Sequence, residues 1–255
     1  MLLLANMIEK FISGGCSMST VTWDQEPRAW PVHVARALHL DQEIDSQTRR
    51  GWQHCIHTAN PAQGNGMISR LVLNHLHGLM KTTPGENILV GIIWSGTTRT
   101  EIYQDRDSIN DSGNFYSVAN QHDGGWALLN AHWSDPKSKL WYRHFYHEIN
   151  SLVASYEHIL RVQWFLQQHH VKYFMGTITQ EVFPKRSLNH DEIKYLHDMI
   201  DFSHFLPIEF GIYEWARDHS GLDFDAHDRC HLNTQQSKLL SEQIIMPFLE
   251  KLDYV

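Results

Sequence analysis

The chain has 255 residues, of which 42% are hydrophobic and 20% are charged, the balance of an ordinary globular protein. A formal net charge of −8 and the lack of a Lys/Arg-rich run argue against a nucleic-acid partner, because phosphate binding requires a basic surface. The length suits one large α/β domain, so we expect residues 1–255 to form a single domain.

The sequence predicts neither a membrane segment nor a signal peptide. The N-terminal run MLLLANMIEKF has no basic residues before it and no small-residue cleavage site. The apolar run NILVGIIW is far below the ~18–20 residues that span a bilayer. Three cysteines (Cys16, Cys55 and Cys230) without CxxC spacing are too few for a disulfide framework. We therefore expect a soluble, cytoplasmic protein that makes no membrane contact.

The first third of the chain predicts two strands and a helix. The stretch KFIS (10–13) is typical of a short buried strand and is followed by glycines, and QHCIHTAN (53–60) is expected to be a second strand. After PAQGNG, an amphipathic helix is expected over 67–80, with apolar residues at helical spacing: Ile68, Leu71, Val72, Leu76 and Leu79.

The later elements continue the alternation. ENILVGIIWSG (86–96) is the clearest strand, and VKYFMGTI (171–178) repeats its pattern after a long helix expected over 142–169. The last helix is expected to begin after Asn233 as N-cap and to bury Leu239, Leu240, Ile244 and Phe248. Such alternation predicts an α/β fold, a three-layer α/β/α sandwich around a mainly parallel sheet.

Two stretches lack sustained periodicity and are expected to be irregular insertions, at about 99–141 and 182–210. In open parallel sheets, such loops gather beyond the carboxyl ends of the strands, where ligands bind. The tryptophans of the first insertion are candidate sugar-stacking surfaces, or simply pack the loops: Trp126, Trp133 and Trp141.

A candidate nucleophile follows the first strand. In FISGGCSMS, two glycines and Cys16 lead to Ser17. A serine needs a base within hydrogen-bond reach and a group that orients the base. Asp228 and His231 lie three residues apart just before the last helix, a spacing that lets the carboxylate hold one ring nitrogen while the other faces outward.

Taken together, these features resemble the SGNH, or GDSL-like, hydrolase family. The resemblance implies a flavodoxin-like sheet and ester hydrolysis by a Ser–His–Asp triad, with Ser17 as nucleophile. Gly64 is the best match to the family's glycine after the second strand, and Gly66 is the alternative. The stretch DRCHLNTQQSKLLSEQI is similar to the family's last block, with Ser241 as its small residue and Leu232 where proline is usual.

The third family block is missing, because the strand ends IIWSGTTRTE without the usual asparagine. The resemblance then implies an oxyanion hole formed by Ser17, Gly64 and Ser95, with Thr97 or the Gly96 N–H as other donors. GCS with WSGxxR is similar to a divergent branch associated with bacteriophages, so virion association is also expected. Arg99 would bind an anionic or polyhydroxyl substrate, or form a salt bridge in a loop.

Three alternatives compete with this interpretation. Cys16 is intrinsically more nucleophilic than serine, although adjacent side chains of an extended segment point opposite ways, so only one of the two can face His231. Asp225 with His227 could replace the later pair, but would put the following residues out of register. The acidic and histidine residues at 225–231 could also bind zinc, without a supporting HExxH motif.

The sequence thus predicts a serine esterase that acts on a small acyl ester or an acylated glycan, with O-acetyl groups as one candidate. The chemistry requires no cofactor and no metal. The rival function is a catalytically idle SGNH-like module used for binding or in a virion. Neither the substrate nor the oligomeric state can be deduced from these residues.

Overall fold

The computed structural model describes residues 7–20, 29–40, 54–105, 124–209, 211–222 and 231–255. Its main sheet has four parallel strands in the order β2-β1-β3-β6. The strands are β1 (Lys10–Gly14), β2 (Cys55–His57), β3 (Ile88–Trp94) and β6 (Lys172–Thr177). All four coincide with strands expected from the sequence, and the α/β class and parallel sheet are confirmed.

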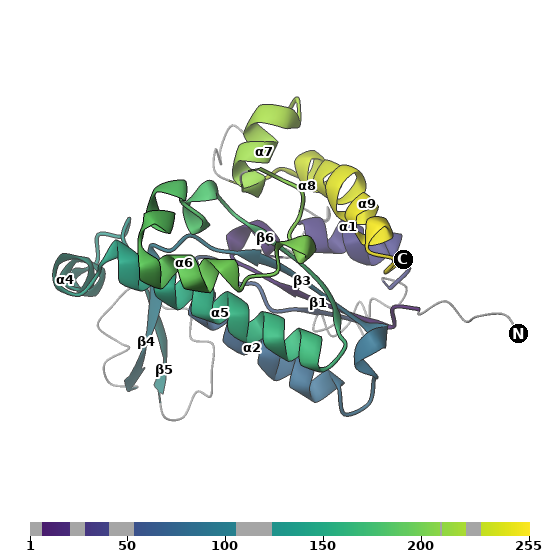
Figure 1. Ribbon diagram of the computed structural model, residues 1–255, viewed down its shortest axis with the longest axis horizontal. Helices are drawn as coiled ribbons and strands as arrows, with labels where there is room; N and C mark the ends of the chain where they lie inside the picture. The colour runs from purple at the N-terminus through teal and green to yellow at the C-terminus, as the bar shows by residue number, and fades with distance from the viewer. Residues whose placement is uncertain (1–6, 21–28, 41–53, 106–123, 210, 223–230) are drawn as a thin grey trace, which may run out of the picture.

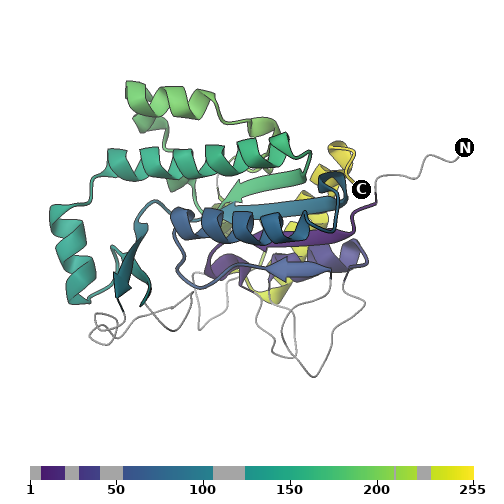
Figure 2. The ribbon, with the colours of Figure 1, turned by 90° about the horizontal axis from the view of Figure 1, so that it is seen from below.

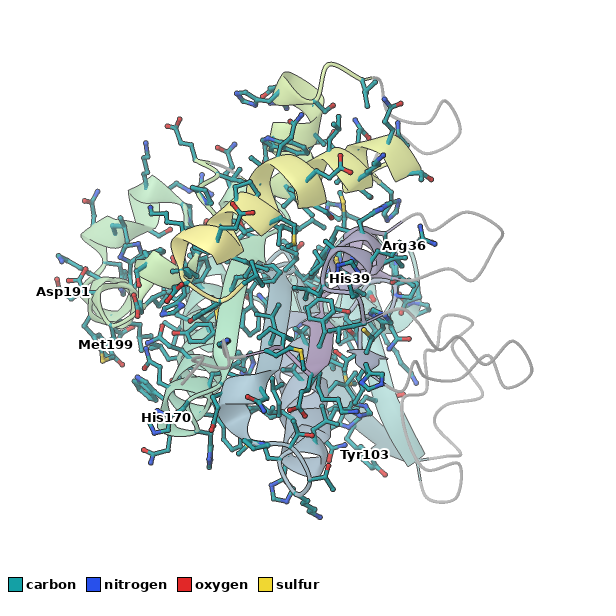
Figure 3. The ribbon with its side chains drawn as sticks, turned by 90° about the vertical axis from the view of Figure 1, so that its right-hand side faces the viewer. Arg36, His39, Tyr103, His170, Asp191 and Met199 are labelled. Atoms are coloured by element: carbon teal, nitrogen blue, oxygen red, sulfur yellow. The ribbon has the colours of Figure 1, made fainter. Side chains whose placement is uncertain are left out.

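The sheet separates two hydrophobic cores. Because side chains alternate along a strand, Phe11 faces one core and Ile12 the other. Every residue of β3 is buried, as a central strand covered on both faces requires. Figure 3 shows the side chains packed on both sides of the sheet, with labelled residues such as Asp191 and Met199 at the periphery.

Helices cover both faces of the sheet (Figures 1 and 2). One core contains side chains of α1 (Trp30–Ala37), α7 (Ile212–His219), α8 (Thr234–Leu240) and α9 (Met246–Lys251). The other contains side chains of α2 (Asn65–Leu79), α5 (Glu148–Gln168) and α6 (Asp191–Asp198). This arrangement is compatible with a three-layer α/β/α fold.

The first insertion is more regular than the sequence suggested. β4 (Arg99–Asp105) pairs antiparallel with β5 (Gly124–Asn130), followed by α4 (Pro136–His144). The polar strand RTEIYQD lacks the apolar alternation that marks a half-buried strand, which is why it was missed. The expected helix over 142–169 is in fact two helices, because His147 caps a new one by accepting from the Ile149 N–H at 3.2 Å.

The second insertion also contains regular structure. It holds α6 and the short 3₁₀ turns η3 (Gln180–Val182), η4 (Lys185–Asn189) and η5 (Phe202–His204). α6 buries only Ile193 and Leu196, too few apolar positions for a periodicity that could be recognised in the sequence. The remaining 3₁₀ turns are η1 (Ser17–Ser19) and η2 (Gly85–Asn87).

The last helix begins where expected. The Asn233 side chain accepts from the Gln236 N–H at 2.8 Å, and the Gln236 side chain accepts from the Asn233 N–H at 3.0 Å. A π-helical segment, Ser241–Ile245, joins α8 to α9. Of the residues expected to face inward, Leu240 and Phe248 are buried, while Leu239 and Ile244 pack against the same core partly exposed.

Candidate active site at the carboxyl edge of the sheet

The carboxyl ends of β1 and β3 lie at the point where the strand order reverses. β1 leads to β2 on one side, whereas β3 lies on its other side. In doubly wound sheets, ligands bind in the crevice outside the carboxyl ends at such a switch point. The residues that follow β1, β2 and β3 are therefore the candidates for a site (Figure 2).

The glycines before Ser17 meet two steric demands. A Cβ on Gly14 would lie 2.6 Å from Val72 Cγ2 of α2, and one on Gly15 would lie 2.3 Å from Ser19 Oγ. Gly15 also has φ +155°, which L side chains rarely adopt. These glycines let β1 approach α2 closely and then turn into η1.

Ser17 is the accessible side chain of this turn. From Phe11 to Ser19 every residue is buried except Ser17, which is partly exposed at the start of η1. Cys16, in contrast, is fully buried within the core on the α1 face. The burial of its thiol argues against Cys16 as the nucleophile.

The last helix packs close to the Ser17 turn through α1. Ser241 Oγ lies 3.2 Å from the Trp30 carbonyl oxygen, and the Trp30 indole N–H donates to Ser19 Oγ at 2.9 Å. The C-terminus of the chain lies near the amino ends of the strands, as shown by the hydrogen bond that Lys172 Nζ, at the start of β6, donates to the Tyr254 carbonyl. The beginning of α8 therefore points towards the carboxyl edge.

His231 is half-buried and stands two residues before the Asn233 cap. Asp228, together with Asp225, His227 and Cys230, lies outside the described residues. The triad, and the meeting of the Ser17 hydroxyl with the His231 imidazole in particular, stays a prediction. The suggested metal cluster at 225–231 likewise falls mostly outside the described residues.

Gly64 lies after β2, as the sequence suggested, and is the N-cap residue of α2, which begins two residues earlier than expected. Its N–H, expected in the oxyanion hole, donates to the Glu101 Oε1 atom at 2.8 Å. The alternative glycine, Gly66, lies within the first turn of the same helix. The N–H of Gly64 thus already has an acceptor in this structure.

Ser95, just after β3, is tied to the start of α2 by Asn65. The Ser95 N–H donates to the Asn65 side chain at 2.8 Å, and the Asn65 amide donates to the Ser95 carbonyl at 3.0 Å. Arg99 Nη1 donates to Ser95 Oγ at 2.9 Å, so the serine proton is left for another acceptor. Arg99 therefore lies on a strand and positions Ser95, rather than standing in a loop.

Glu101 is a site residue that the sequence did not single out. Its side chain is 5% exposed and lies 3.4 Å from Arg70 Nη2. Burial raises the pKa of this carboxyl, while Arg70 and the backbone N–H donors oppose the rise. A lone glutamate in a polar strand gives no sequence signal of such a role.

Two tryptophans of the insertion, Trp126 and Trp141, pack against other side chains of the protein. The Arg70 guanidinium lies 3.9 Å from the centre of the Trp126 ring, and Tyr103 contacts that ring edge-on at 5.6 Å. Trp141 packs against Phe145 at 5.4 Å between ring centres. These contacts favour packing over sugar stacking for Trp126 and Trp141.

A second serine–histidine pair lies inside the sheet. Ser13 Oγ is 2.6 Å from His57 Nδ1, and the two residues are neighbours in the β1–β2 register. Burial lowers the pKa of His57 to about 4, so the ring is neutral near pH 7. Because Ser13 is fully buried, this pair contributes to the fold rather than forming a nucleophile.

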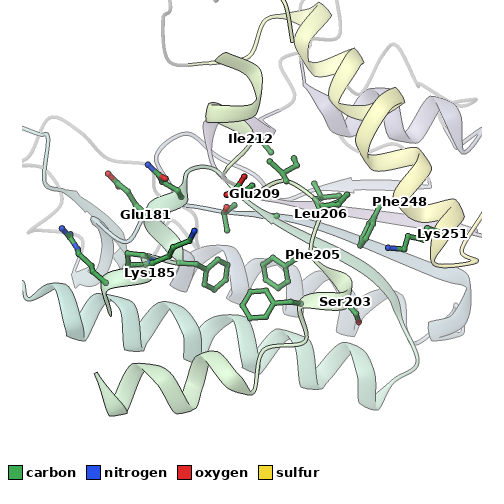
Figure 4. A pocket seen from close by; sticks show the side chains of 18 residues that line it. Glu181, Lys185, Ser203, Phe205, Leu206, Glu209, Ile212, Phe248 and Lys251 are labelled. Carbon is green, nitrogen blue, oxygen red and sulfur yellow. The ribbon is translucent and has the colours of Figure 1, made fainter. Parts of the chain in front are cut away.

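A large cavity of about 1040 Å³ lies beside the edge strand β6 (Figure 4). Its floor includes Phe183, Phe202 and Phe205, whose ring centres are 5.2–5.5 Å apart. Charged side chains that line it include Lys185, Lys251, Glu181 and Glu209. Ser17, Gly64 and Ser95 are not among its lining residues, so it is separate from the Ser17 turn.

No group of three or more metal-ligating His, Cys, Asp or Glu side chains occurs among the described residues. Within the same ranges, no helix combines the length and apolar character needed to cross a bilayer.

Comparison with known proteins assigns a family but no activity. Residues 18–207 match a family of unknown function, DUF6071. The chain belongs to this family. No curated protein and no solved structure matches it. The matched region contains Gly64, Ser95, Arg99 and Glu101, whereas it begins one residue after Ser17 and ends before His231.

Proposed function

We propose that this DUF6071 chain is a serine hydrolase that cleaves carboxylic esters, built on an SGNH-type, flavodoxin-like sheet with insertions. The observation that carries the proposal is the position of Ser17. It is the accessible hydroxyl in an otherwise buried turn, directly after the central strand β1 and at the switch point of the sheet. The strand order β2-β1-β3-β6 supports the flavodoxin-like assignment.

In the proposed reaction, Ser17 attacks the ester carbonyl while His231 takes its proton as general base. Asp228 fixes the imidazole tautomer and stabilises the imidazolium. The proton then passes from His231 to the leaving alkoxide, and an acyl-enzyme forms. Water activated by His231 attacks the acyl-enzyme and releases the carboxylic acid.

The proposed oxyanion donors are the Ser17 N–H, the Gly64 N–H and the Ser95 hydroxyl. The hydroxyl of Ser95 replaces the asparagine that the third block lacks, and Arg99 orients it by donating to its oxygen. One such donor is worth about 3–4 kcal/mol of activation free energy. The Gly64 N–H takes part only once Glu101 releases it.

The substrate is proposed to be a small acyl ester or an acylated glycan, with O-acetyl groups as one candidate. Arg99 is proposed to contact a polar or anionic part of the substrate as well as Ser95. The acyl-ester class follows from the family resemblance, whereas the glycan follows from the aromatic side chains of the first insertion. The proposed role of Arg99 is supported by its position next to Ser95 at the edge of the sheet.

A second candidate function is a catalytically idle module that binds a ligand or a virion component. Two observations favour it. The Gly64 N–H is engaged by Glu101, and the large cavity beside β6 is lined without Ser17. Covalent chemistry at Ser17 separates the two candidates.

The test is labelling with a serine-directed fluorophosphonate. We expect the parent protein to be labelled at Ser17, Ser17→Ala to lose all labelling, and His231→Ala to label at least about a hundredfold more slowly. Ser203→Ala, in the exposed turn η5, serves as the matched control and keeps the parent rate. Labelling that persists in Ser17→Ala would exclude this nucleophile. Absence of labelling in the parent favours the idle module.

A further inference from the structure

The first turn of α2 holds a carboxylate that comes from the inserted strand β4. Glu101 Oε1 accepts from the Gly64 N–H at 2.8 Å, and the Met67 N–H also donates to this carboxylate. A helix N-terminus favours an anion, because its first N–H groups have no partner within the helix and its dipole is positive there. The Glu101 carboxylate therefore occupies the position in which a helix N-terminus would bind an external anion.

Two glycines make room for this carboxylate. A Cβ on Gly64 would lie 2.6 Å from Glu101 Oε1, and a Cβ on Gly66 would lie 2.8 Å from Oε2. The glycine-rich stretch QGNG therefore forms a socket around the anion. Any residue with a side chain at either position would push the carboxylate out or force the backbone to shift.

A buried amide beside the socket adds a further donor. Gln63 is 3% exposed, and its Nε2 atom has no hydrogen-bond partner among the described residues. With Glu101 and Trp126 it lines a cavity of about 10 Å³, room for roughly one water molecule. A buried N–H donor without an acceptor is costly, so its presence here points to a polar ligand beside the helix start.

We propose that the N-terminal turn of α2 is the anion site of the catalytic centre, and that Glu101 occupies it until an ester substrate displaces the carboxylate. The inference rests on the proposed function, because it takes the Gly64 N–H as an oxyanion donor. A carboxylate oxygen and the oxyanion of the tetrahedral intermediate offer the same acceptor to that N–H. Glu101 therefore keeps the resting site closed.

The element that carries Glu101 is suited to move. In the described part of the chain, β4 pairs with β5 alone, outside the main sheet. A shift of this pair leaves the four-stranded ladder intact. The buried carboxylate also loses hydration where it lies, which offsets part of its hydrogen bonding, and it regains that hydration on moving into water.

The anion site is tested apart from catalysis by adding sodium acetate to Glu101→Ala. The truncation empties the socket, and acetate restores a carboxylate to it. We expect acetate to raise the Tm of Glu101→Ala in a saturable manner beyond sodium chloride at equal ionic strength, with no such rise in the parent protein. Glu148→Ala, which removes an exposed glutamate of the Arg186 ion pair, is the matched control and should not respond. An absent response in Glu101→Ala, or an equal one in the parent, overturns the site.

Closure by Glu101 is tested by the rate of fluorophosphonate labelling at Ser17. We expect Glu101→Ala to label about tenfold faster or more than the parent, and acetate to slow the variant again. Equal rates in the two proteins overturn closure and leave the proposed function standing. Absence of labelling in both, with the acetate response retained, overturns the proposed function and with it the catalytic role of the site. Should Glu101→Ala fail to fold, Glu101→Met, which keeps the length of the side chain without an oxygen acceptor for the Gly64 N–H, takes its place, and a rate equal to the parent's again overturns closure.

Discussion

The two neighbouring side chains Cys16 and Ser17 in the stretch GGCS differ in solvent exposure. Cys16 is enclosed in the core, while Ser17 is the one accessible side chain of the turn. Gly15 sets this arrangement, because its backbone conformation and the nearby Ser19 hydroxyl leave no room for a Cβ. At the scale of single residues, then, steric constraints on glycine decide which hydroxyl reaches the sheet edge.

We predict opposite effects for two glycine-to-alanine substitutions. Gly15→Ala should lower the free energy of unfolding by about 2–3 kcal/mol, because it adds steric conflict to a backbone conformation that alanine rarely adopts. Gly78→Ala should raise it by roughly 0.5–1 kcal/mol, since a helical Cβ there meets nothing within 4 Å. Urea unfolding of the two variants and the parent measures both values. A Gly15→Ala protein as stable as the parent would contradict the strained turn.

Helix ends position the elements around the candidate site. α8 begins at a capping box formed by Asn233 and Gln236, two residues after His231. α2 begins at Gly64, whose N–H is satisfied by a carboxylate from another element. The cap of α8 is formed by residues three positions apart in the sequence, whereas the acceptor at the start of α2 comes from a strand 37 residues away. Only the local one can be recognised from residue spacing.

We predict that Asn233→Ala lowers the free energy of unfolding by about 1–2 kcal/mol, because the Gln236 N–H loses its acceptor at the start of α8. Thermal or urea unfolding measures the change. Gln235→Ala, an exposed position in the same turn, is the control and should change stability by less than about 0.5 kcal/mol. Equal effects of the two substitutions would show that the cap contributes nothing measurable.

At the scale of the whole molecule, two half-buried histidines couple folding to pH. Burial lowers the pKa of His57 and of His158 to about 4, and for His158 the nearby Arg161 and Arg70 add to the effect. The unfolded chain binds protons on these rings below about pH 6.5, whereas the folded chain does so only near pH 4. Stability is therefore lost as the pH falls through this window.

Glu101 acts in the opposite direction. Burial raises the pKa of its carboxyl in the folded state above the ordinary value of 4.5. The folded protein then binds this proton more tightly than the unfolded chain, so the contribution of Glu101 to stability declines as the pH rises from about 4.5. On acidification it offsets part of the loss caused by the histidines.

We predict that the parent protein loses stability between pH 6.5 and pH 4, with about 2–3 kcal/mol from each of the two histidines. In His57→Gln the loss should be smaller, because one of the two uncharged rings is gone. His75→Gln, exposed on α2, is the control and should follow the parent. Urea unfolding at several pH values gives the slopes, and an unchanged slope in His57→Gln would contradict the neutral buried ring.

The sequence by itself determined the elements whose signals are local. The apolar runs of β3 and β6, the period of α2 and the cap at Asn233 were all predicted, since each depends on residues near one another in the chain. The parallel sheet followed from their alternation. The position of Ser17 at a strand end was predicted for the same reason.

Only the tertiary structure decided which groups meet. The pairing of β4 with β5 and the approach of Glu101 to Gly64 both depend on β4, whose polar sequence carries no periodic signal. A buried carboxylate is stabilised by donors that the fold brings from elsewhere, here a helix start 37 residues away in the chain. Partners of this kind are set by packing, because no local spacing of residues encodes a contact between distant segments.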